Sequence, residues 1–231
     1  MKKFLLTNPY EDLTLFQGIA ASDIFRALRC LCAVEKTYEK DEMIVHFGES
    51  IDHLSLLLSG NVYLYHLNSM GERNIISQLK RGDLIGGTLV FSQNPISPYS
   101  IVCVDACRTL LIDPTQIKLE QPPLCPFKGL LMKNLLFMIV QENSALREKL
   151  DLTAIKSLRE KIFNYLCLQF TIHKTSSFTI PFVNRADFAD YLGVNCSALS
   201  RELGRMRDEG ILDFYKNSFV LKHYPAEKKK A

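Results

Sequence analysis

Hydrogen-bond donors gather at helical spacing in residues 195–205, which read NCSALSRELGR. Arg201 can donate two parallel hydrogen bonds to O6 and N7 of a guanine base, and Ser200 stands next to it. Arg205 follows about one helical turn later, where a contact to a backbone phosphate is more typical than a contact to a base. The predicted outward face of this helix is made of Asn195, Cys196, Ser197, Ser200, Arg201 and Arg205.

Two short helices with a hinge between them are predicted to position this face. Asn184 and Asn195 are good N-caps, and Gly193 and Gly210 are typical helix ends. The apolar residues of the second helix, Leu199, Leu203 and Met206, are spaced to point inward.

The segment after the second helix, ILDFYKNSFVLK, alternates in hydrophobicity about Lys216-Asn217 and predicts a β hairpin. Helix, hinge, helix and hairpin are the parts of a winged helix-turn-helix, which binds double-stranded DNA. Arg185 begins the first helix and is a candidate phosphate contact. The alternative for Arg201 is a solvated side chain paired with Glu202 or Asp208.

Short apolar runs broken by glycines fill the chain from about residue 35 to residue 112. The runs HLSLLLSG, NVYLYHL, RNIISQL, YSIVCV and RTLLI predict strands of an antiparallel β sandwich or small barrel. Five glycines separate these runs, at intervals of 12, 11, 11 and 4 residues. An interval of 11 or 12 residues fits one strand and one turn, and each glycine is expected to supply the positive φ of a tight turn. They are Gly48, Gly60, Gly71, Gly82 and Gly86.

A long helix is predicted from about residue 128 to residue 150, after a proline-rich segment. Apolar residues advance along it by alternating steps of four and three, the spacing of a helix that packs along a partner helix. We interpret it as a dimerisation helix, although the same seam could pack on its own domain. The seam residues are Met132, Leu136, Ile139, Asn143, Leu146 and Leu150. Asn143 either fixes the register of the pair or faces solvent. A second helix is expected at about 154–170.

Composition narrows the possible partners. Residues 1–150 carry 15 basic and 16 acidic side chains, whereas residues 151–231 carry 13 basic and 9 acidic ones, so a polyanion is expected to bind at the C-terminal end. The seven cysteines are an odd number, scattered through apolar segments, which indicates reduced thiols. The apolar start at Met1 stops before Asn8-Pro9, too early for a secretion signal, and no stretch is long enough to span a membrane. We therefore expect a cytoplasmic protein.

The order of these parts resembles the Crp/Fnr family of bacterial transcription regulators over nearly the whole chain. The resemblance implies an α+β fold with three segments: a cyclic-nucleotide-binding-type β roll, which is a double-stranded antiparallel β sandwich, at 1–127, a dimerisation helix at 128–152 and a winged helix-turn-helix at 153–231. Ser200-Arg201 matches the serine-arginine pair of that family. Cys196 and Ser197 stand where many members carry an arginine or glutamate, so the DNA half-site does not follow from the resemblance.

The resemblance also locates an effector region. Cyclic-AMP-binding members carry Gly-Glu for the ribose and, about ten residues later, Arg-Ser or Arg-Thr for the phosphate. Here Gly86-Gly87 and Ser97-Pro98-Tyr99 stand in those places, so neither the ribose acceptor nor the phosphate cation is present. We expect no useful cyclic AMP binding. The roll either binds another small-molecule effector, lined by Gly86, Gly87, Thr88 and Tyr99, or is a scaffold in which these residues only pack.

The sequence contains no clear pattern of metal ligands or catalytic residues. Fnr-like members hold an iron-sulfur cluster through several closely spaced N-terminal cysteines, but this chain has only Cys30 and Cys32 there, and on a helix they would diverge by about 200°. No iron-sulfur cluster, no other metal site and no catalytic constellation is expected. The resulting prediction is a homodimeric DNA-binding regulator, with RNA polymerase as a further possible partner. The alternative is a cyclic-nucleotide-binding-type module that acts through protein contacts.

Overall fold

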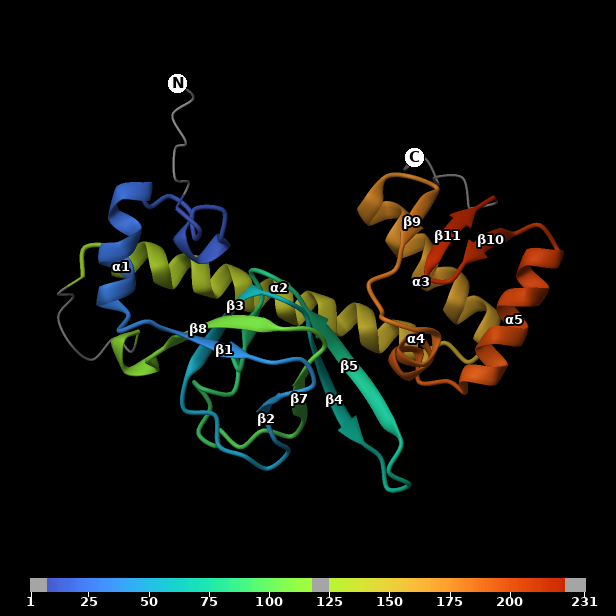
Figure 1. Cartoon of the computed structure of the whole chain (residues 1–231), viewed down its shortest axis with the longest axis horizontal. Helices are drawn as coiled ribbons and strands as arrows, with labels where there is room; N and C mark the ends of the chain where they lie inside the picture. The colour runs from blue at the N-terminus through green and yellow to red at the C-terminus, as the bar shows by residue number, and fades with distance from the viewer. Residues whose placement is uncertain (1–7, 118–124, 223–231) are drawn as a thin grey trace. The chain divides into compact units, whose positions relative to one another are not determined.

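The computed structural model describes residues 8–117 and 125–222 (Figure 1). The described chain forms two compact units: the first contains the residues up to His66 and Ser77–Ala145, and the second contains Leu67–Ile76 and the residues from Leu146 onward. This division differs from the predicted segments, because it falls inside the long helix. Residues 1–7, on which the expectation of no secretion signal depends, lie outside the described chain.

Eight strands form two antiparallel four-stranded sheets, as predicted. The sheet orders are β1-β8-β3-β6 and β2-β7-β4-β5. The strands are β1 Val34–Tyr38, β2 Met43–Val45, β3 Leu54–Ser59, β4 Val62–Leu67, β5 Arg73–Leu79, β6 Leu84–Ile85, β7 Ser100–Cys103 and β8 Cys107–Ile112. The sequence of β3 is a nearly continuous apolar run. This fits its position, since Leu54, Leu56 and Leu57 are buried on both faces of the strand.

All five turn glycines have positive φ, between +77° and +92°, which confirms the prediction made from their spacing. Two of them also lie too close to their neighbours for a side chain. A Cβ on Gly60 would lie 2.6 Å from Sγ of Cys107, and a Cβ on Gly86 would lie 2.8 Å from Cγ2 of Ile51. Glycine is therefore required at both positions for space as well as for backbone conformation.

Helices precede and follow the strands of the first unit. They are η1 Thr14–Phe16, η2 Ala21–Asp23, α1 Ile24–Cys30, η3 Pro114–Gln116 and α2 Lys128–Ala154. The expectation that Cys30 and Cys32 share a helix is wrong: α1 ends at Cys30, and Cys32 follows in a turn with φ of +47°. Asn134 of α2 donates hydrogen bonds to the carbonyls of Leu15 and Gln17, both at 2.9 Å. These two hydrogen bonds hold the N-terminal segment of the first unit on α2.

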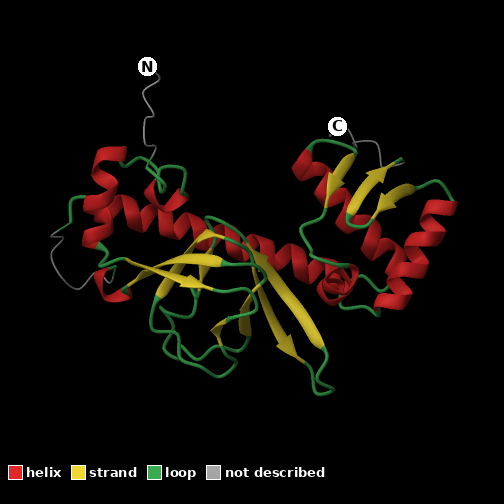
Figure 2. Cartoon of the chain, viewed as in Figure 1, coloured by secondary structure: helices red, strands yellow, loops and turns green. Residues whose placement is uncertain are grey.

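The second unit contains the predicted winged helix-turn-helix (Figure 2). Its elements are α3 Leu158–His173, β9 Ser177–Thr179, α4 Arg185–Leu192, α5 Cys196–Asp208, β10 Leu212–Tyr215 and β11 Ser218–Leu221, with sheet order β10-β11-β9. α3 starts four residues later than predicted because the Ser157 side chain caps it, accepting from the Glu160 amide at 3.3 Å.

Aromatic rings form the core between the helices and the hairpin of the second unit. The ring centroid of Phe188 on α4 lies 5.0 Å from that of Tyr165 on α3 and 5.5 Å from that of Phe182. Phe219 on β11 meets Phe188 edge-on at 6.3 Å. In the part of the chain that the structure describes, no helix is long and apolar enough to cross a membrane.

Candidate nucleic-acid interface and effector region

Side-chain caps and glycines set the bounds of the two helices of the helix-turn-helix. Oδ1 of Asn184 accepts from the amide of Asp187 at 2.9 Å, and Oδ1 of Asn195 accepts from the amides of Ser197 at 2.9 Å and Ala198 at 3.2 Å. Gly193 ends α4 with φ of +64°. Both predicted caps are confirmed. Since the Asn195 side-chain oxygen caps α5, its amide nitrogen is the group left for an outside contact.

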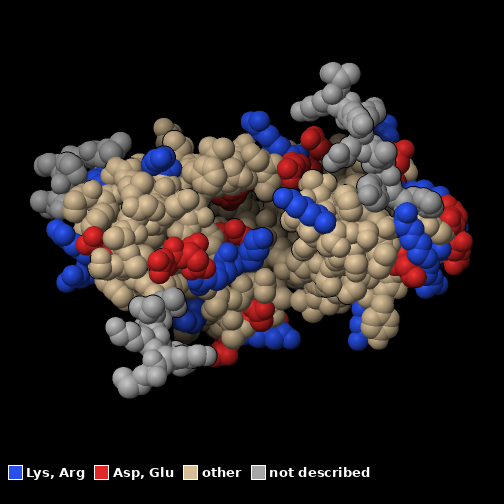
Figure 3. Space-filling view, turned by 90° about the horizontal axis from the view of Figure 1, so that it is seen from above, with Lys and Arg blue, Asp and Glu red and all other residues tan. Residues whose placement is uncertain are grey.

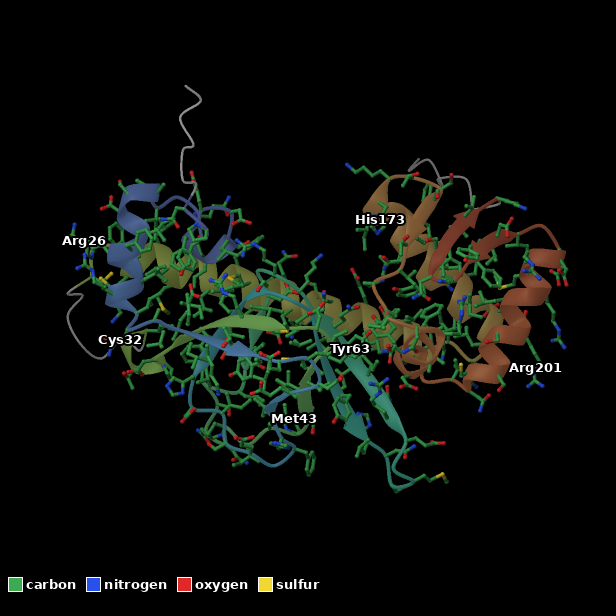
Figure 4. The ribbon with its side chains drawn as sticks, in the orientation of Figure 1. Arg26, Cys32, Met43, Tyr63, His173 and Arg201 are labelled. Carbon is green, nitrogen blue, oxygen red and sulfur yellow. The ribbon has the colours of Figure 1, made fainter. Side chains whose placement is uncertain are left out.

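The predicted outward face of α5 is exposed. Leu199, Leu203 and Met206 are fully buried. Ser197, Ser200, Arg201 and Arg205 are exposed, and Cys196 is half-buried. Figure 4 shows the side chain of Arg201 extending away from α5. The structure thus brings the predicted DNA-facing residues of α5 to one accessible surface.

The acids that could neutralise Arg201 bind other arginines. Nε of Arg159 donates to Glu202 at 2.6 Å, and Nη1 of Arg205 lies 3.4 Å from the second oxygen of Glu202. Asp208 lies 3.8 Å from Arg207. The structure therefore does not favour the alternative that Glu202 or Asp208 neutralises Arg201. Arg205 is partly engaged with Glu202, although its side chain remains 71% exposed.

Arg159 of α3 is a positioning residue that sequence reasoning missed. Besides Glu202, its guanidinium binds both carboxylate oxygens of Glu209, at 2.6 and 2.7 Å. The hydrogen bonds from Arg159 hold the pKa of Glu209 below its usual value. One arginine thus joins α3 to the middle of α5 and to the residue that follows it. Its partners lie 43 and 50 residues away, and no local pattern in the sequence points to them.

Arg185, predicted to contact phosphate, lies against the hairpin. Its guanidinium carbon is 5.1 Å from the ring centroid of Phe214 and 5.3 Å from that of Phe219. One nitrogen donates to the carbonyl of Lys216 in the turn at 2.5 Å, and Nη1 is buried without a hydrogen-bond partner among the described residues. Burial lowers the pKa of Arg185. In this arrangement Arg185 holds the wing, and its contact with a phosphate stays a prediction.

Arg73, at the start of β5, binds two carboxylates of α4 within the second unit. Its Nε donates to Asp190 at 2.9 Å, and its terminal nitrogen pairs with Asp187, which is only 4% exposed. A carboxylate at the N-terminal turn of α4 is also favoured by the helix dipole. No local pattern in the sequence points to this pairing, because Arg73 lies 114 residues from Asp187.

Two buried lysines bind the carbonyl end of α4. Lys149, near the end of α2, donates to the carbonyl of Tyr191 and lies 3.4 Å from the centroid of that ring. Lys161 of α3 donates to the carbonyl of Leu192 at 3.3 Å. Burial, reinforced by the charge of Lys161, lowers the pKa of Lys149 to about 7. These ammonium groups satisfy carbonyls that the end of a helix leaves without internal partners.

Two of the four predicted effector residues, Gly87 and Tyr99, lie near a carboxylate. Gly86 and Gly87 are buried, Tyr99 is half-buried and Thr88 is exposed. A Cβ on Gly87 would lie 3.4 Å from Oε2 of Glu142, a residue of α2, and this oxygen is buried without a hydrogen-bond partner in the described chain. Burial and the charge of Glu142 raise the pKa of Tyr99 to about 12. Burial and the charge of Asp83 raise the pKa of Glu142.

The exposed apolar strip of α2 only partly coincides with the predicted seam. Of the seam residues, Leu136, Asn143 and Leu150 are exposed, and Met132, Ile139 and Leu146 are half-buried. Phe137 and Val140, which the seam omitted, are more than half exposed. The opposite face is buried through Leu131, Asn134, Leu135 and Met138. The apolar surface left open therefore runs through Leu136, Phe137, Val140 and Leu150.

Charge is mixed on the face of the protein shown in Figure 3. Basic and acidic side chains lie beside one another there and do not form a continuous basic surface. This agrees with the formal net charge of only +3. Affinity for a polyanion would therefore depend on individually placed side chains more than on a general positive field. Within the described residues, no three His, Cys, Asp or Glu side chains are grouped to hold a metal ion.

The described residues form, in this order, a β roll, a long helix and a winged helix-turn-helix. The chain is similar in sequence and fold to transcription regulators, and several of the similar solved structures are regulators of the CRP/FNR family. Residues 35–118 match the cyclic nucleotide-binding domain family. The chain is 23% identical over 192 residues to transcriptional activator protein FnrL of Cereibacter sphaeroides, covering 77% of this chain and 71% of FnrL.

A second curated relative and two solved structures are also similar to the chain over more than three quarters of its length. An anaerobic regulatory protein of Pasteurella multocida is 26% identical over 181 residues, covering 77% of this chain and 64% of that protein. The structure of FixK2 from Bradyrhizobium japonicum matches with a TM-score of 0.64 at 22% identity, over 83% of this chain and 93% of FixK2. The global regulator CLP of Xanthomonas campestris matches with a TM-score of 0.68 at 16% identity, over 88% of this chain and all of that structure. These structural matches support the predicted fold.

The buried Lys149 predicts a pH-dependent stability. The free energy of unfolding should rise between about pH 7 and pH 10, because the unfolded chain, with an ordinary lysine pKa near 10.4, binds a proton that folded Lys149 has lost above its pKa of about 7. Lys149→Met keeps an apolar stem and should lack this part of the rise, roughly 3–4 kcal/mol. Urea unfolding from pH 6 to pH 10 measures it.

Lys156→Met is the matched control for Lys149→Met, because Lys156 is exposed just beyond α2. It should keep the pH slope of the unmodified protein. A Lys149→Met variant with that same slope would show that Lys149 titrates like a solvated lysine.

Proposed function

We propose that this protein is a homodimeric, sequence-specific DNA-binding regulator of transcription whose β roll responds to an effector other than cyclic AMP. The observation that carries the proposal is the exposed face of α5. Ser200 and Arg201 are exposed on a helix whose opposite side is fully buried, and the nearby acids Glu202 and Asp208 are engaged by other arginines. An arginine presented in this way on the second helix of a helix-turn-helix has the geometry for reading guanine in the major groove.

The rigidity of the second unit supports this role. α5 is fixed on α3 by Arg159, and α4 is fixed at its two ends by Arg73 and by the lysine pair. A recognition helix must be held within a fraction of an ångström to discriminate between bases, and supporting contacts of this kind provide that restraint. A module that acted only through protein contacts would not require such a supported helix-turn-helix.

Dimerisation is supported by the exposed strip of α2. Leu136 and Leu150 are 64% and 67% exposed, and Phe137 and Val140 lie between them. The spacing of Leu136, Val140, Asn143 and Leu150 follows steps of four, three and seven, so these side chains share one helix face. Two copies of this face would bury apolar surface that a monomer leaves in water.

The effector proposal rests on Glu142. The carboxylate lies next to Gly87 and within electrostatic reach of Tyr99, where the resemblance places the phosphate and ribose of cyclic AMP. Bringing a phosphate anion to a buried carboxylate would add repulsion without supplying a cation. A ligand there would instead be a hydrogen-bond donor or carry positive charge. It would regulate DNA binding only through different affinities for two arrangements of the protein.

Arg201 is predicted to read sequence. The purified protein should select from a random DNA pool a palindrome whose half-site centres lie about one helical turn apart. Arg201→Ala should lose about 1–3 kcal/mol of discrimination at one base pair, measured by competition between consensus and mutated sites. Arg205→Ala, on the same face, should weaken all sequences together and reduce the salt dependence. Equal discrimination by Arg201→Ala and the unmodified protein would contradict the assignment.

The strip on α2 is predicted to hold the dimer. Leu136→Glu should raise the dimer dissociation constant at least about 100-fold, since it places a charge in the centre of an apolar contact. Sedimentation equilibrium at micromolar concentration measures the change. Ala145→Glu, an exposed position on the side of the same helix that faces away from the strip, should change it little. If the unmodified protein sediments as a monomer at this concentration, the proposed homodimer is wrong.

Cyclic AMP is predicted not to bind. Titration calorimetry should detect no saturable heat up to about 1 mM nucleotide. Glu142→Gln removes the carboxylate charge without changing its shape, so any weak binding should strengthen in that variant. A micromolar dissociation constant for the unmodified protein would overturn the proposal for the effector while leaving the DNA-binding role intact.

A further inference from the structure

Two pairs of cysteines lie near each other in the first unit, and only one pair is accessible. Cys103 and Cys107 interact electrostatically but are only 1% and 2% exposed. The Cys107 thiol donates to the carbonyls of Asn61 at 3.4 Å and Asp105 at 3.1 Å, so this pair belongs to the core. Cys30 and Cys125 line the same small cavity and are both half-buried, so a reagent in solution can approach them.

The second pair joins two elements that are already in contact. Cys30 is the last residue of α1, and Cys125 lies three residues before α2. Both line a small cavity whose other walls are mainly apolar, including Leu31, Ile117 and Met132. The guanidinium of Arg26 on α1 lies 5.9 Å from the ring centroid of Phe127, so the two segments meet at a second point besides the thiols. A bond between the sulfurs would therefore link segments that the fold already places together.

The two thiols have different surroundings. Burial, then the hydrogen bond to Cys125, raise the pKa of Cys30 to about 11, while the charges of Arg26 and Arg29 act in the opposite direction. Cys30 is therefore the protonated partner near neutral pH, and its S–H donates toward the sulfur of Cys125. A thiol that stays protonated is the poorer nucleophile, because the thiolate is the nucleophilic form of cysteine. The arrangement gives Cys125 the role of attacking thiol and Cys30 the role of resolving thiol.

We propose that Cys30 and Cys125 are a redox-active dithiol that forms a reversible intramolecular disulfide with small-molecule disulfides of the glutathione type. The Cys125 thiolate attacks one sulfur of the small disulfide, forming a mixed disulfide and releasing one glutathione thiolate, which takes up a proton. The Cys30 thiol then gives up its proton and attacks the Cys125 sulfur, releasing the second glutathione. Two cysteine thiols are oxidised, and one glutathione disulfide is reduced to two glutathione thiols.

The cross-link has a structural consequence that does not depend on the DNA-binding role. It closes a loop from the end of α1 to the start of α2, enclosing the whole β roll. Such a bond reduces the conformational freedom of the unfolded chain, so the thermal midpoint of the oxidised protein should rise by roughly 5–10 °C. Reduction should return the midpoint to its original value.

The test uses the full-length protein equilibrated with mixtures of reduced and oxidised glutathione, then alkylated and digested with trypsin. Mass spectrometry should find peptide 30–36 joined to peptide 119–128 under oxidising conditions. Cys32→Ser should keep this link, although Cys32 is more exposed than Cys30 and occupies the same peptide. Cys103 and Cys107 should remain alkylatable only after unfolding.

The single variants separate the two roles. Cys30→Ser should lose the link and accumulate glutathione on Cys125, because no resolving thiol remains. Cys125→Ser should lose the link and leave Cys30 largely unmodified. A link through Cys32, a link only between two chains, or equal glutathione on Cys30 and Cys125 in the two variants would overturn the proposal. Because these readouts need no DNA, failure of the proposed function would leave them unchanged.

Discussion

The second unit depends on the binding of two ammonium groups to the carbonyl end of α4. A helix end that is covered by other elements must find donors for its last carbonyls, and Lys149 and Lys161 supply them from two different helices. The cost is the burial of two like charges, and it is visible in the pKa of Lys149, lowered to about 7. Because both lysines bind the same end of α4, this helix is joined to the end of α2 through Lys149 and to the start of α3 through Lys161. Any movement of α2 in this region must move α4 as well.

The distribution of acids explains how the surface of α5 stays available. Arg159 forms ion pairs with Glu202 and Glu209, and Glu202 also pairs with Arg205. Arg73 forms ion pairs with Asp187 and Asp190. Each pairing gives a structural role to a carboxylate that would otherwise lower the positive potential near the DNA-facing side. An arginine without an intramolecular partner keeps its full hydrogen-bonding capacity for a ligand. The same acids that hold the winged helix together therefore leave Arg201 without an acidic partner among the described residues.

Local chemistry made much of this fold predictable. Asn184, Asn195, Gly193 and the turn glycines act on backbone atoms within a few residues, so their effect can be read from sequence. The exposed face of α5 followed from the spacing of three apolar residues. The bounds of α3 were less accurate because α2 continues to Ala154 and Ser157 supplies the next cap.

The remaining features arise from contacts between distant segments. Arg159 with Glu209, Lys149 with Tyr191, and Cys30 with Cys125 have no periodic signature, since each depends on how separate elements pack. Arg185 illustrates the limit: its place at a helix N-terminus indicates a phosphate contact, but no pattern in the sequence points to its contacts with the Phe214 and Phe219 rings and the Lys216 carbonyl. The strip on α2 differs from the predicted seam for a similar reason. A heptad pattern shows that one face is apolar, but only the packed roll shows which neighbouring face is already covered.

The effector region illustrates how a conserved architecture can carry a changed chemistry. Gly86 must remain glycine because of its positive φ and the nearby Ile51, so the turn itself is fixed by the roll. Glu142 on α2 lies next to Gly87, the residue that follows this turn, and the proposed ligand preference rests on it. A buried carboxylate with a raised pKa is either protonated, and then donates a hydrogen bond, or charged, and then requires a donor or a cation. Because Glu142 belongs to the same helix as the exposed apolar strip, a ligand that changed its environment would act directly on α2. Such coupling is typically worth 1–3 kcal/mol, which is enough to change DNA affinity by about one to two orders of magnitude.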